Sequence, residues 1–267
     1  MKITSAANPK IKQIIRLKDR GHRQKDGLTV IEGVREVTRA LEAGVKLMEV
    51  YVCPEYLDRP TDLSADIAKF RTLADKMTRP VEVTPAVFRK IAFGERKEGV
   101  VGVGSLTPRP LSGLKISAGS LVVVADGIEK PGNLGAILRT CDAAGVDALI
   151  VCSGTDLDNP NVIRASIGTA FTVPAACAEV TEAAAFLKDR KIRVITSVVD
   201  AAQTYNQADL SSGCAIVLGR EQSGVSEEWS RAGAQAVRIP MRGKSDSLNV
   251  SAAAAVLIFE ALRQRDK

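Results

Sequence analysis

Histidine is almost absent from this 267-residue chain, which contains only His22. A zinc site of the His-x-x-x-His type is therefore excluded, and a histidine-based catalytic triad would have to use this one residue. No run of about 18 apolar residues occurs, and the first residues lack a secretory apolar stretch. We therefore expect a cytoplasmic protein without a membrane-spanning segment.

Cysteine occurs in a pattern that excludes the common metal and redox motifs. The five cysteines are odd in number and scattered, with no Cys-x-x-Cys pair. We interpret them as small buried side chains. No metal site is predicted, and any chemistry must mostly use Arg, Asn, Ser, Glu and backbone groups. The cysteines are Cys53, Cys141, Cys152, Cys177 and Cys214.

Positive charge is concentrated at the N-terminus. The formal net charge is +6, and residues 1–25 carry eight lysines and arginines against one acid, Asp19. Such a basic stripe attracts phosphate backbones through Coulomb steering and counterion release. A solvated helix face is the alternative, and the bulky aromatics of a membrane-surface anchor are missing. The candidate side chains for binding a phosphate backbone are Lys10, Lys12, Arg16 and Lys18.

The N-terminal half alternates between helical and strand patterns, which predicts an α/β unit of about a hundred residues. Apolar residues recur at helical spacing between residues 8 and 20, with the cations on the other side. Further helices are expected at 34–43, 63–78 and 85–91, and strands at 28–31, 48–53, 81–83 and 100–104.

Residues 107–119 are rich in proline, glycine and serine and form the best candidate linker. Beyond them, near-continuous apolar runs alternate with helical stretches, as expected of parallel strands covered on both faces. We therefore predict one α/β domain at 1–106 and a second, with a parallel sheet, at 120–267. Its strands are expected at 121–125, 148–152, 192–197, 215–218 and 236–239.

Polar loops follow three of these strands, and the carboxyl ends of parallel strands meet at one edge of a sheet. The first loop leads into a helix near Asn133. It is not a dinucleotide fingerprint, because Gly-x-Gly-x-x-Gly is missing, and Asn133 stands where a phosphate-binding loop needs lysine. Asn133 could simply cap that helix, on which Arg139 would be costly to bury without an anionic partner.

The second and third loops also combine glycine with polar side chains. In the second loop, Gly219 would let the backbone approach a ligand, and Glu221 could balance an arginine or accept hydrogen bonds. In the third loop, Ser247 or Asn249 could cap the alanine-rich helix that follows. That helix could pack internally or across a symmetric dimer. Each loop taken alone is also compatible with an ordinary turn.

Taken together, the three loops resemble the signature motifs of the SpoU (TrmH) family of RNA ribose 2′-O-methyltransferases, in the SPOUT superfamily. The N-terminal half resembles that family's RNA-binding extension, a ribosomal-protein-like α/β domain, through Asn8-Pro-Lys-Ile-Lys and Val30-Ile-Glu-Gly-Val-Arg-Glu. The motifs are Asn133-Leu-Gly-Ala-Ile-Leu-Arg139, Leu218-Gly-Arg-Glu-Gln-Ser-Gly224 and Ile239-Pro-Met followed by Ser247-Leu-Asn-Val-Ser251.

The resemblance implies a C-terminal domain with a deep trefoil knot, S-adenosylmethionine bound in the knot, and a homodimer whose interface completes the site. It implies a reaction centre of Asn133, Arg139, Glu221, Ser247 and Asn249. It also implies cofactor contacts from Leu218, Gly219, Gly224, Ile239, Met241 and Leu248, and an RNA-phosphate contact from Arg164.

The family's proposed mechanism makes Arg139 the general base. A guanidinium normally stays protonated and donates hydrogen bonds. We therefore expect Arg139 to orient the ribose hydroxyl and stabilise the developing alkoxide, with a phosphate assisting proton transfer.

Structured RNA is the implied substrate, with 23S rRNA expected first and tRNA as the nearest alternative. Residues 93–103 are similar to antibiotic-resistance members such as the thiostrepton-resistance methyltransferase. A non-catalytic RNA-binding or ribosome-assembly factor is an alternative of a different class, against which the intact reaction-centre motifs argue. A Rossmann-type nucleotide enzyme is disfavoured by the missing glycine fingerprint.

Overall fold

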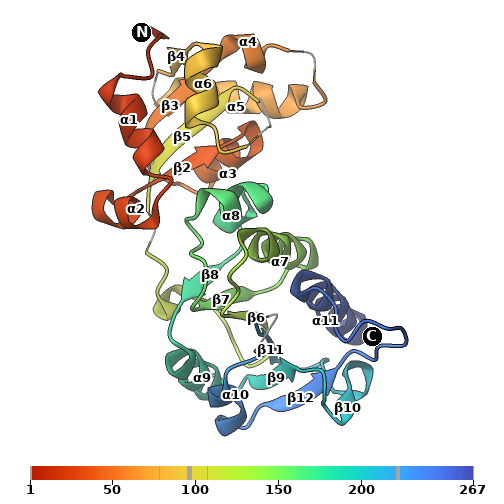
Figure 1. Cartoon of the computed structure of the whole chain (residues 1–267). Coiled ribbons are helices and arrows are strands. Elements are labelled where there is room, and N and C mark those ends of the chain that lie inside the picture. The colour runs from red at the N-terminus through yellow and green to blue at the C-terminus, as the bar shows by residue number, and fades with distance from the viewer. Residues whose placement is uncertain are drawn as a thin grey trace. The chain divides into compact units, whose positions relative to one another are not determined.

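In the computed structural model, the chain forms two compact units (Figure 1). The first unit comprises Met1–Pro108 and Leu157–Thr172, and the second comprises Arg109–Asp156 and Val173–Lys267. The structure describes residues 2–59, 61–77, 79–94, 98–106, 108–220 and 223–266, with backbone only at 75–77. No helix in these ranges is long and apolar enough to cross a membrane.

A mixed five-stranded sheet forms the centre of the first unit, in the order β1-β4-β3-β5-β2. Strands β1, β4 and β3 are parallel, and β5 runs antiparallel to both β3 and β2. The predicted strands are confirmed, and the two-residue β1 is added to them. The strands are β1 (Lys2–Ile3), β2 (Leu28–Glu32), β3 (Leu47–Val52), β4 (Val81–Val83) and β5 (Val100–Ser105).

Helices pack on this sheet through their apolar faces. In α1, Ile11 and Ile14 are buried and join a core that also contains residues of α6. The helix predicted over 8–20 is wrong at its end, because α1 stops at Arg16. A separate helix, α2, begins after Asp19, whose carboxylate accepts a hydrogen bond from the His22 backbone N–H at 3.1 Å. The helices are α1 (Pro9–Arg16), α2 (Arg20–Asp26), α3 (Val34–Glu42), α4 (Pro54–Leu57), α5 (Ser64–Met77) and α6 (Pro85–Ile91).

Residues 157–172 complete the first unit from a distant part of the sequence. They form α8 (Pro160–Ala165) and the short 3-10 helix η2 (Thr169–Phe171), and α8 packs on β2. The Thr29 hydroxyl donates a hydrogen bond to the Asp158 carbonyl oxygen at 2.6 Å, and the Arg39 guanidinium donates to the Ile167 carbonyl oxygen. The chain therefore passes between the two units three times.

A seven-stranded sheet, parallel throughout, forms the second unit and confirms the predicted parallel sheet. Its order is β10-β12-β9-β11-β6-β7-β8, and β11, β6 and β7 are fully buried, as apolar strands covered on both faces should be. The strands are β6 (Leu121–Asp126), β7 (Ala148–Cys152), β8 (Ala175–Cys177), β9 (Arg193–Ser197), β10 (Gln203–Thr204), β11 (Cys214–Leu218) and β12 (Gln235–Arg238).

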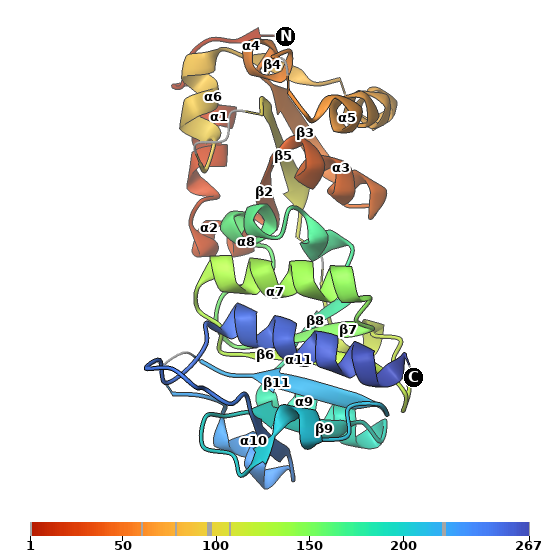
Figure 2. The same ribbon diagram turned by 90° about the vertical axis from the view of Figure 1, so that its right-hand side faces the viewer.

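Helices α7 and α11 lie side by side in the second unit, as Figure 2 shows, and α11 also contacts β11. Helix α9 packs against α10 and contacts β7 and β9. A single core cluster joins the strands to α9 and to the fully buried Trp229 of α10. The helical elements are η1 (Leu111–Gly113), α7 (Pro131–Ala144), α9 (Val180–Asp189), η3 (Tyr205–Gln207), α10 (Glu227–Arg231) and α11 (Val250–Arg265).

The interpretation of all five cysteines as buried is wrong at one position. Cys177 is exposed, whereas the other four thiols are buried and free. Cys177 ends β8, the edge strand of the seven-stranded sheet, and its side chain points away from the core. No group of His, Cys, Asp and Glu among the described residues could hold a metal ion.

Candidate functional site

A cavity of about 740 Å³ opens at the carboxyl edge of the parallel sheet in the second unit. The loops after β9, β11 and β12 and the first turn of α11 form its wall. All six residues predicted to contact a cofactor line it, and so do Ser247 and Asn249 of the predicted reaction centre. The six are Leu218, Gly219, Gly224, Ile239, Met241 and Leu248. The sequence therefore located this cavity, although its motifs are spread over some thirty residues of chain.

The loop after β11 folds back on itself closely enough to require glycine. The Arg220 backbone N–H donates to the Gly224 carbonyl oxygen at 2.8 Å, and the Gly224 N–H donates to the Arg220 carbonyl oxygen at 3.0 Å. A Cβ at Gly219 would overlap the backbone of Gly224, which itself has a φ of +70°. Both glycines are thus explained by the packing of the loop that forms the cavity wall.

Asp126 anchors the segment that follows this loop. Its carboxylate lies at the carboxyl end of β6 and is 1% exposed. Oδ2 accepts hydrogen bonds from the Ser226 backbone N–H at 2.7 Å and from the Trp229 Nε1–H at 3.2 Å. Because buried donors need partners, this carboxylate fixes where the chain runs from Gly224 into α10. Sequence reasoning did not select Asp126, since one acid at a strand end carries no motif.

Two asparagines connect the first and third loops. The Asn249 Nδ2 donates to the Asn133 Oδ1 at 3.2 Å, while the Asn249 Oδ1 accepts from the Ser251 backbone N–H at 3.0 Å. Asn249 is therefore the N-cap of α11, as one of the two predicted alternatives required. The suggestion that Asn133 caps α7 is wrong, because α7 starts at Pro131 and Asn133 lies inside its first turn. Asn133 instead lines a second cavity of about 250 Å³ that shares Lys130, Arg220, Ser223 and Val250 with the larger one.

Arg139 lies apart from both cavities. It is exposed on α7 and belongs to the lining of neither. The cost of burying this guanidinium, anticipated from the apolar sequence of α7, therefore does not arise within one chain. Glu221, the remaining residue of the predicted reaction centre, lies outside the described residues.

A fourth loop contributes to the cavity and was missed from the sequence. Residues 197–200 are the last residue of β9 and the start of the loop after it, and β9 lies between β12 and β11, so this loop is next to the other two. Val199 is 57% exposed and Leu248 is 39% exposed, although both are apolar cavity-lining residues. The loop carries no motif, and only the strand order reveals it.

The predicted RNA-binding cations of the first unit have different environments. Lys10 pairs with Glu49, and the Lys18 Nζ donates to the Ala92 carbonyl oxygen at 3.1 Å while lying 4.8 Å from the centre of the Phe93 ring. Lys12 and Arg16 are exposed and line a separate hollow, described below.

Arg164 is half-buried, and its guanidinium occupies the space that a side chain at Gly94 would fill. Burial raises the pKa of the nearby Glu32 carboxyl, and this effect is opposed by the Phe93 N–H, which donates to it at 2.6 Å, and by the positive charge of Arg164. The structure thus brings Arg164 close to a buried acid of its own unit.

The chain is thus an α/β protein with a cavity at the carboxyl edge of a parallel sheet, lined by residues of the second and third loop motifs and bordered by Asn133 of the first. The SpoU rRNA methylase family model matches residues 120–259, and an MRM3-like substrate-binding domain matches residues 8–102. The chain belongs to the SpoU rRNA methylase family.

Individual relatives match across both units. The 23S rRNA (guanosine-2′-O-)-methyltransferase RlmB of Bordetella pertussis is 34% identical over 86% of this chain and 94% of its own. A crystal structure of an RNA 2′-O ribose methyltransferase is 38% identical, covers all of both chains and superposes with a TM-score of 0.86. An AdoMet-bound rRNA methyltransferase from Sinorhizobium meliloti is 28% identical over 98% of this chain and 97% of its own, with a TM-score of 0.86.

Proposed function

We propose that this protein transfers a methyl group from S-adenosylmethionine to a ribose 2′-hydroxyl of 23S rRNA. The observation that carries the proposal is the cavity at the sheet edge, which is lined by all six expected cofactor residues together with Ser247 and Asn249. The family to which the chain belongs and the substrate named for its Bordetella pertussis relative support the same activity. Because ribosomal RNA is the proposed substrate, the cytoplasm is the proposed compartment.

The lining of the cavity fits an adenosyl group. Exposed Val199 and Leu248 offer apolar surface that a purine would cover, and such burial is favourable. Gly219 and Ile239 line the same cavity, and we assign hydrogen bonds to the cofactor to their backbone groups. When bound, S-adenosylmethionine supplies a methyl group already activated for transfer to oxygen.

The protein's own task is then to position the ribose hydroxyl and manage its proton. We place this task on Arg139, Asn133, Glu221, Ser247 and Asn249. With the donor bound, the hydroxyl oxygen would take the methyl group, the thioether S-adenosylhomocysteine would leave, and the hydroxyl proton would pass to a phosphate or to water. Arg139 remains protonated, orients the hydroxyl and stabilises the developing negative charge. Positioning of this kind accounts for large rate gains.

Arg139 can take this role only if it reaches a cavity that it does not line in its own chain. We therefore propose that the protein is a homodimer in which Arg139 of one protomer serves the cavity of the other. The adjacent pair of helices, α7 and α11, is the proposed contact surface. Phe259 on α11 supports this choice, because its large apolar side chain is 50% exposed.

A mixing experiment tests the dimer directly. Arg139→Ala and Gly219→Ala variants should each be inactive as homodimers, one lacking the arginine and the other the cavity. After unfolding and refolding together, random pairing should give about a quarter of the sites both functional parts, so activity should reappear. If the refolded mixture contains mixed dimers but shows no methyl-transfer activity, Arg139 acts in the site of its own chain.

We further propose that the C-terminal part of the second unit forms a deep trefoil knot. The chain leaves the sheet at β12 and returns so that α11 packs on α7 and β11, although β9 separates β12 from β11. For this return, the segment between β12 and α11 must cross the neighbouring loops. This crossing supports the proposal that the chain is knotted.

Two measurements test the activity. Calorimetry should show S-adenosylmethionine binding to the purified protein, and a deletion strain should lack one 2′-O-methyl mark in 23S rRNA that the purified protein restores. A missing tRNA mark would instead favour the tRNA alternative. A mark whose loss changes drug sensitivity would favour a resistance role. Absence of cofactor binding would favour a non-catalytic RNA-binding or assembly factor.

A further inference from the structure

The basic N-terminal segment separates into cations that hold the fold and cations that do not. Lys10 and Lys18 are engaged with Glu49 and with backbone carbonyls. Arg23 is 3% exposed, and its guanidinium donates to the carbonyl oxygens of Leu17 and Lys18 at 3.3 and 3.0 Å. By contrast, three exposed cations have no ion pair with any described residue: Lys12, Arg16 and Lys25.

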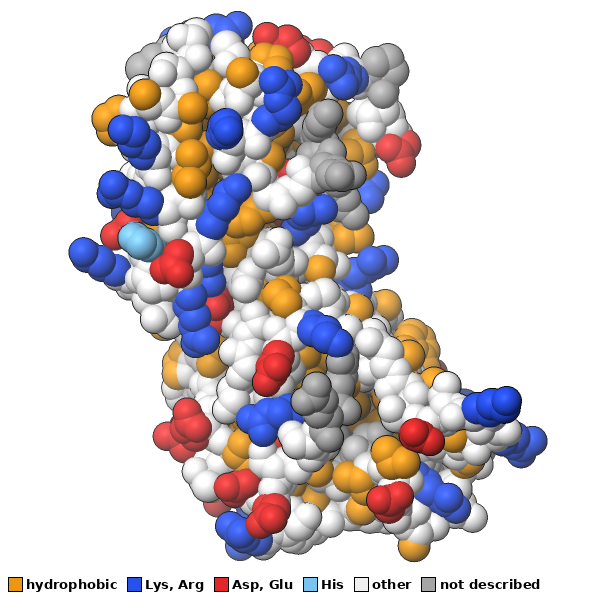
Figure 3. Space-filling model, viewed as in Figure 1, with side chains coloured by type: hydrophobic (Ala, Val, Ile, Leu, Met, Phe, Trp, Pro, Cys, Tyr) orange, Lys and Arg blue, Asp and Glu red, His pale blue; other side chains and the backbone are white. Residues whose placement is uncertain are grey.

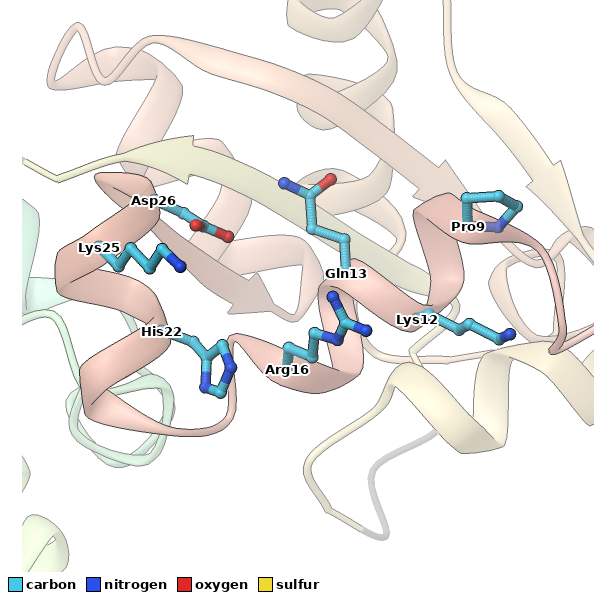
Figure 4. A pocket seen from close by; sticks show the side chains of 7 residues that line it. All are labelled: Pro9, Lys12, Gln13, Arg16, His22, Lys25 and Asp26. Carbon is cyan, nitrogen blue, oxygen red and sulfur yellow. The ribbon is translucent and has the colours of Figure 1, made fainter.

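These three cations surround one hollow of about 510 Å³ between α1 and α2. Figure 4 shows Lys25 and Asp26 extending from α2 toward α1, with Gln13 and Arg16 rising from α1 on the facing side. In Figure 3, lysine and arginine side chains flank the only histidine on this face, with acidic side chains close by.

The turn between α1 and α2 shapes the hollow in advance. The buried Arg23 guanidinium holds the carbonyl groups of Leu17 and Lys18. The Asp19 carboxylate holds both the backbone N–H and the ring Nδ1 of His22, each at 3.1 Å. These contacts fix the backbone at the turn between the two helices, so binding requires less ordering of the main chain and costs less free energy.

The hollow is lined by cations, a carboxylate and an amide, and binding of a simple anion would require only the cations. Three cations attract negative charge, whereas Asp26 accepts hydrogen bonds and repels anions. The Gln13 amide both donates and accepts. A ribonucleotide matches this set, because its phosphate faces cations while its ribose 2′-hydroxyl can donate to a carboxylate. The 2′-hydroxyl is the group through which proteins distinguish RNA from DNA.

We propose that this hollow, lined by Lys12, Gln13, Arg16, His22, Lys25 and Asp26, is a binding site for one ribonucleotide of the substrate RNA. The cations bind the phosphodiester and Asp26 accepts from the 2′-hydroxyl. The proposal rests on the proposed function for the identity of the RNA. It narrows the basic stripe to one site, and it assigns Lys10 and Lys18 to holding the first unit together.

Two triple variants of the full-length protein test the site at equal net charge. Lys12→Gln, Arg16→Gln and Lys25→Gln together remove its cations. Lys46→Gln, Lys69→Gln and Lys90→Gln together remove three exposed lysines elsewhere on the same unit. Binding to a 23S rRNA transcript is measured over a range of salt concentrations. The first triple should weaken binding at least about tenfold and lower the salt slope by about one for each cation removed. The second triple should change both much less.

Equal effects of the two triples would overturn the proposal, because net charge alone would then explain the loss. Wild-type affinity and slope in the first triple would also overturn it. Asp26→Ala provides a second measurement, since it should reduce the preference for an RNA oligonucleotide over DNA of the same sequence. An unchanged preference would remove Asp26 from the site.

His22 supplies a direct readout, because the chain has only one histidine and its ring protons give unique nuclear magnetic resonance signals. A short RNA hairpin should shift these signals, and inorganic phosphate at equal phosphate concentration should shift them far less. Equal shifts would identify a general anion site and overturn the ribonucleotide assignment. Calorimetry with S-adenosylmethionine distinguishes the ribonucleotide site from the proposed methyl transfer. If the protein binds no S-adenosylmethionine but RNA still shifts the His22 signals, the proposed function is contradicted and the ribonucleotide site is not.

Discussion

The loop after β11 can form the cavity wall only because residue 219 has no Cβ. A Cβ at Gly219 has no room against the Gly224 backbone, and relief would require moving main chain rather than a flexible side chain. One methyl group at this position therefore acts on a ligand site without touching the ligand itself.

We expect Gly219→Ala to weaken S-adenosylmethionine binding by between about fivefold and about 150-fold, because overpacking of this kind costs about 1–3 kcal/mol and each 1.4 kcal/mol is tenfold in affinity. Calorimetry measures the affinity, and circular dichroism checks the fold. Gly243→Ala is the matched control, since a Cβ there meets nothing within 4 Å. Binding by Gly219→Ala as tight as by the control would show that the loop adapts.

Glu32 gives a prediction about pH. Burial is the main reason that its pKa is raised above 4.5, so the ionised carboxylate is disfavoured in the folded state. Ionisation of buried Glu32 lowers the free energy of unfolding. This loss is absent when the pH is below the pKa of Glu32 in the unfolded chain, grows as the pH rises, and is complete above the pKa in the folded protein. Glu32→Gln should therefore be more stable than the wild type at pH 7, with the difference shrinking toward pH 4.5. Thermal unfolding at both pH values measures it, and a less stable variant at pH 7 would show that the Arg164 charge dominates.

At the scale of elements, long apolar strands and amphipathic helices were predictable, whereas most of the short strands were not. Buried β6, β7 and β11 follow from their sequences alone. Strands β1, β8 and β10 have two or three residues and were missed, whereas β4, also three residues long, was predicted from its Val81-Glu-Val83 alternation. The break between α1 and α2 was missed because Asp19 was counted as one charge within a helix rather than as its cap.

The candidate site shows the same division between local and long-range information. The second and third loop motifs located the large cavity, since each begins within a few residues of a strand end, whereas Asn133 of the first motif lines the smaller cavity beside it. The loop at 197–200, the anchor Asp126 and the exposed position of Arg139 depend on which strands and helices become neighbours. No spacing along the chain encodes those contacts.

The edge position of β8 leads to a chemical prediction. Burial raises the pKa of Cys53 to about 11 and that of Cys141 and Cys152 to about 12, so these thiols stay protonated near neutral pH. Exposed Cys177 should therefore react first with a thiol reagent. Mass spectrometry after a short exposure to iodoacetamide should find it labelled ahead of the other four, and Cys177→Ser should abolish the fast phase. Fast labelling of a buried thiol would reveal local opening.

At the scale of the whole molecule, the first unit depends on a segment that lies within the sequence range of the methylase match. Residues 157–172 add α8, which packs on β2 and carries the buried Val162 and Ile163, and burial of such a side chain contributes about 1.5–3 kcal/mol. A boundary drawn near residue 106 omits this contribution.

We therefore expect residues 1–108 alone to be less stable than the same fragment joined by a flexible linker to residues 157–172. The gain should be about 2 kcal/mol or more, measured by urea unfolding. A fusion carrying a scrambled 157–172 sequence controls for added chain length. Equal stability of the two fusions would show that the segment packs without stabilising the unit.

The same segment constrains how the protein is made. A ribosome synthesises the chain from its N-terminus, and domains commonly fold as they emerge. Here the substrate-binding unit cannot be completed until residue 172 has left the exit tunnel, by which time two strands of the catalytic sheet, β6 and β7, are already present. The two units are therefore expected to mature together during translation rather than one after the other.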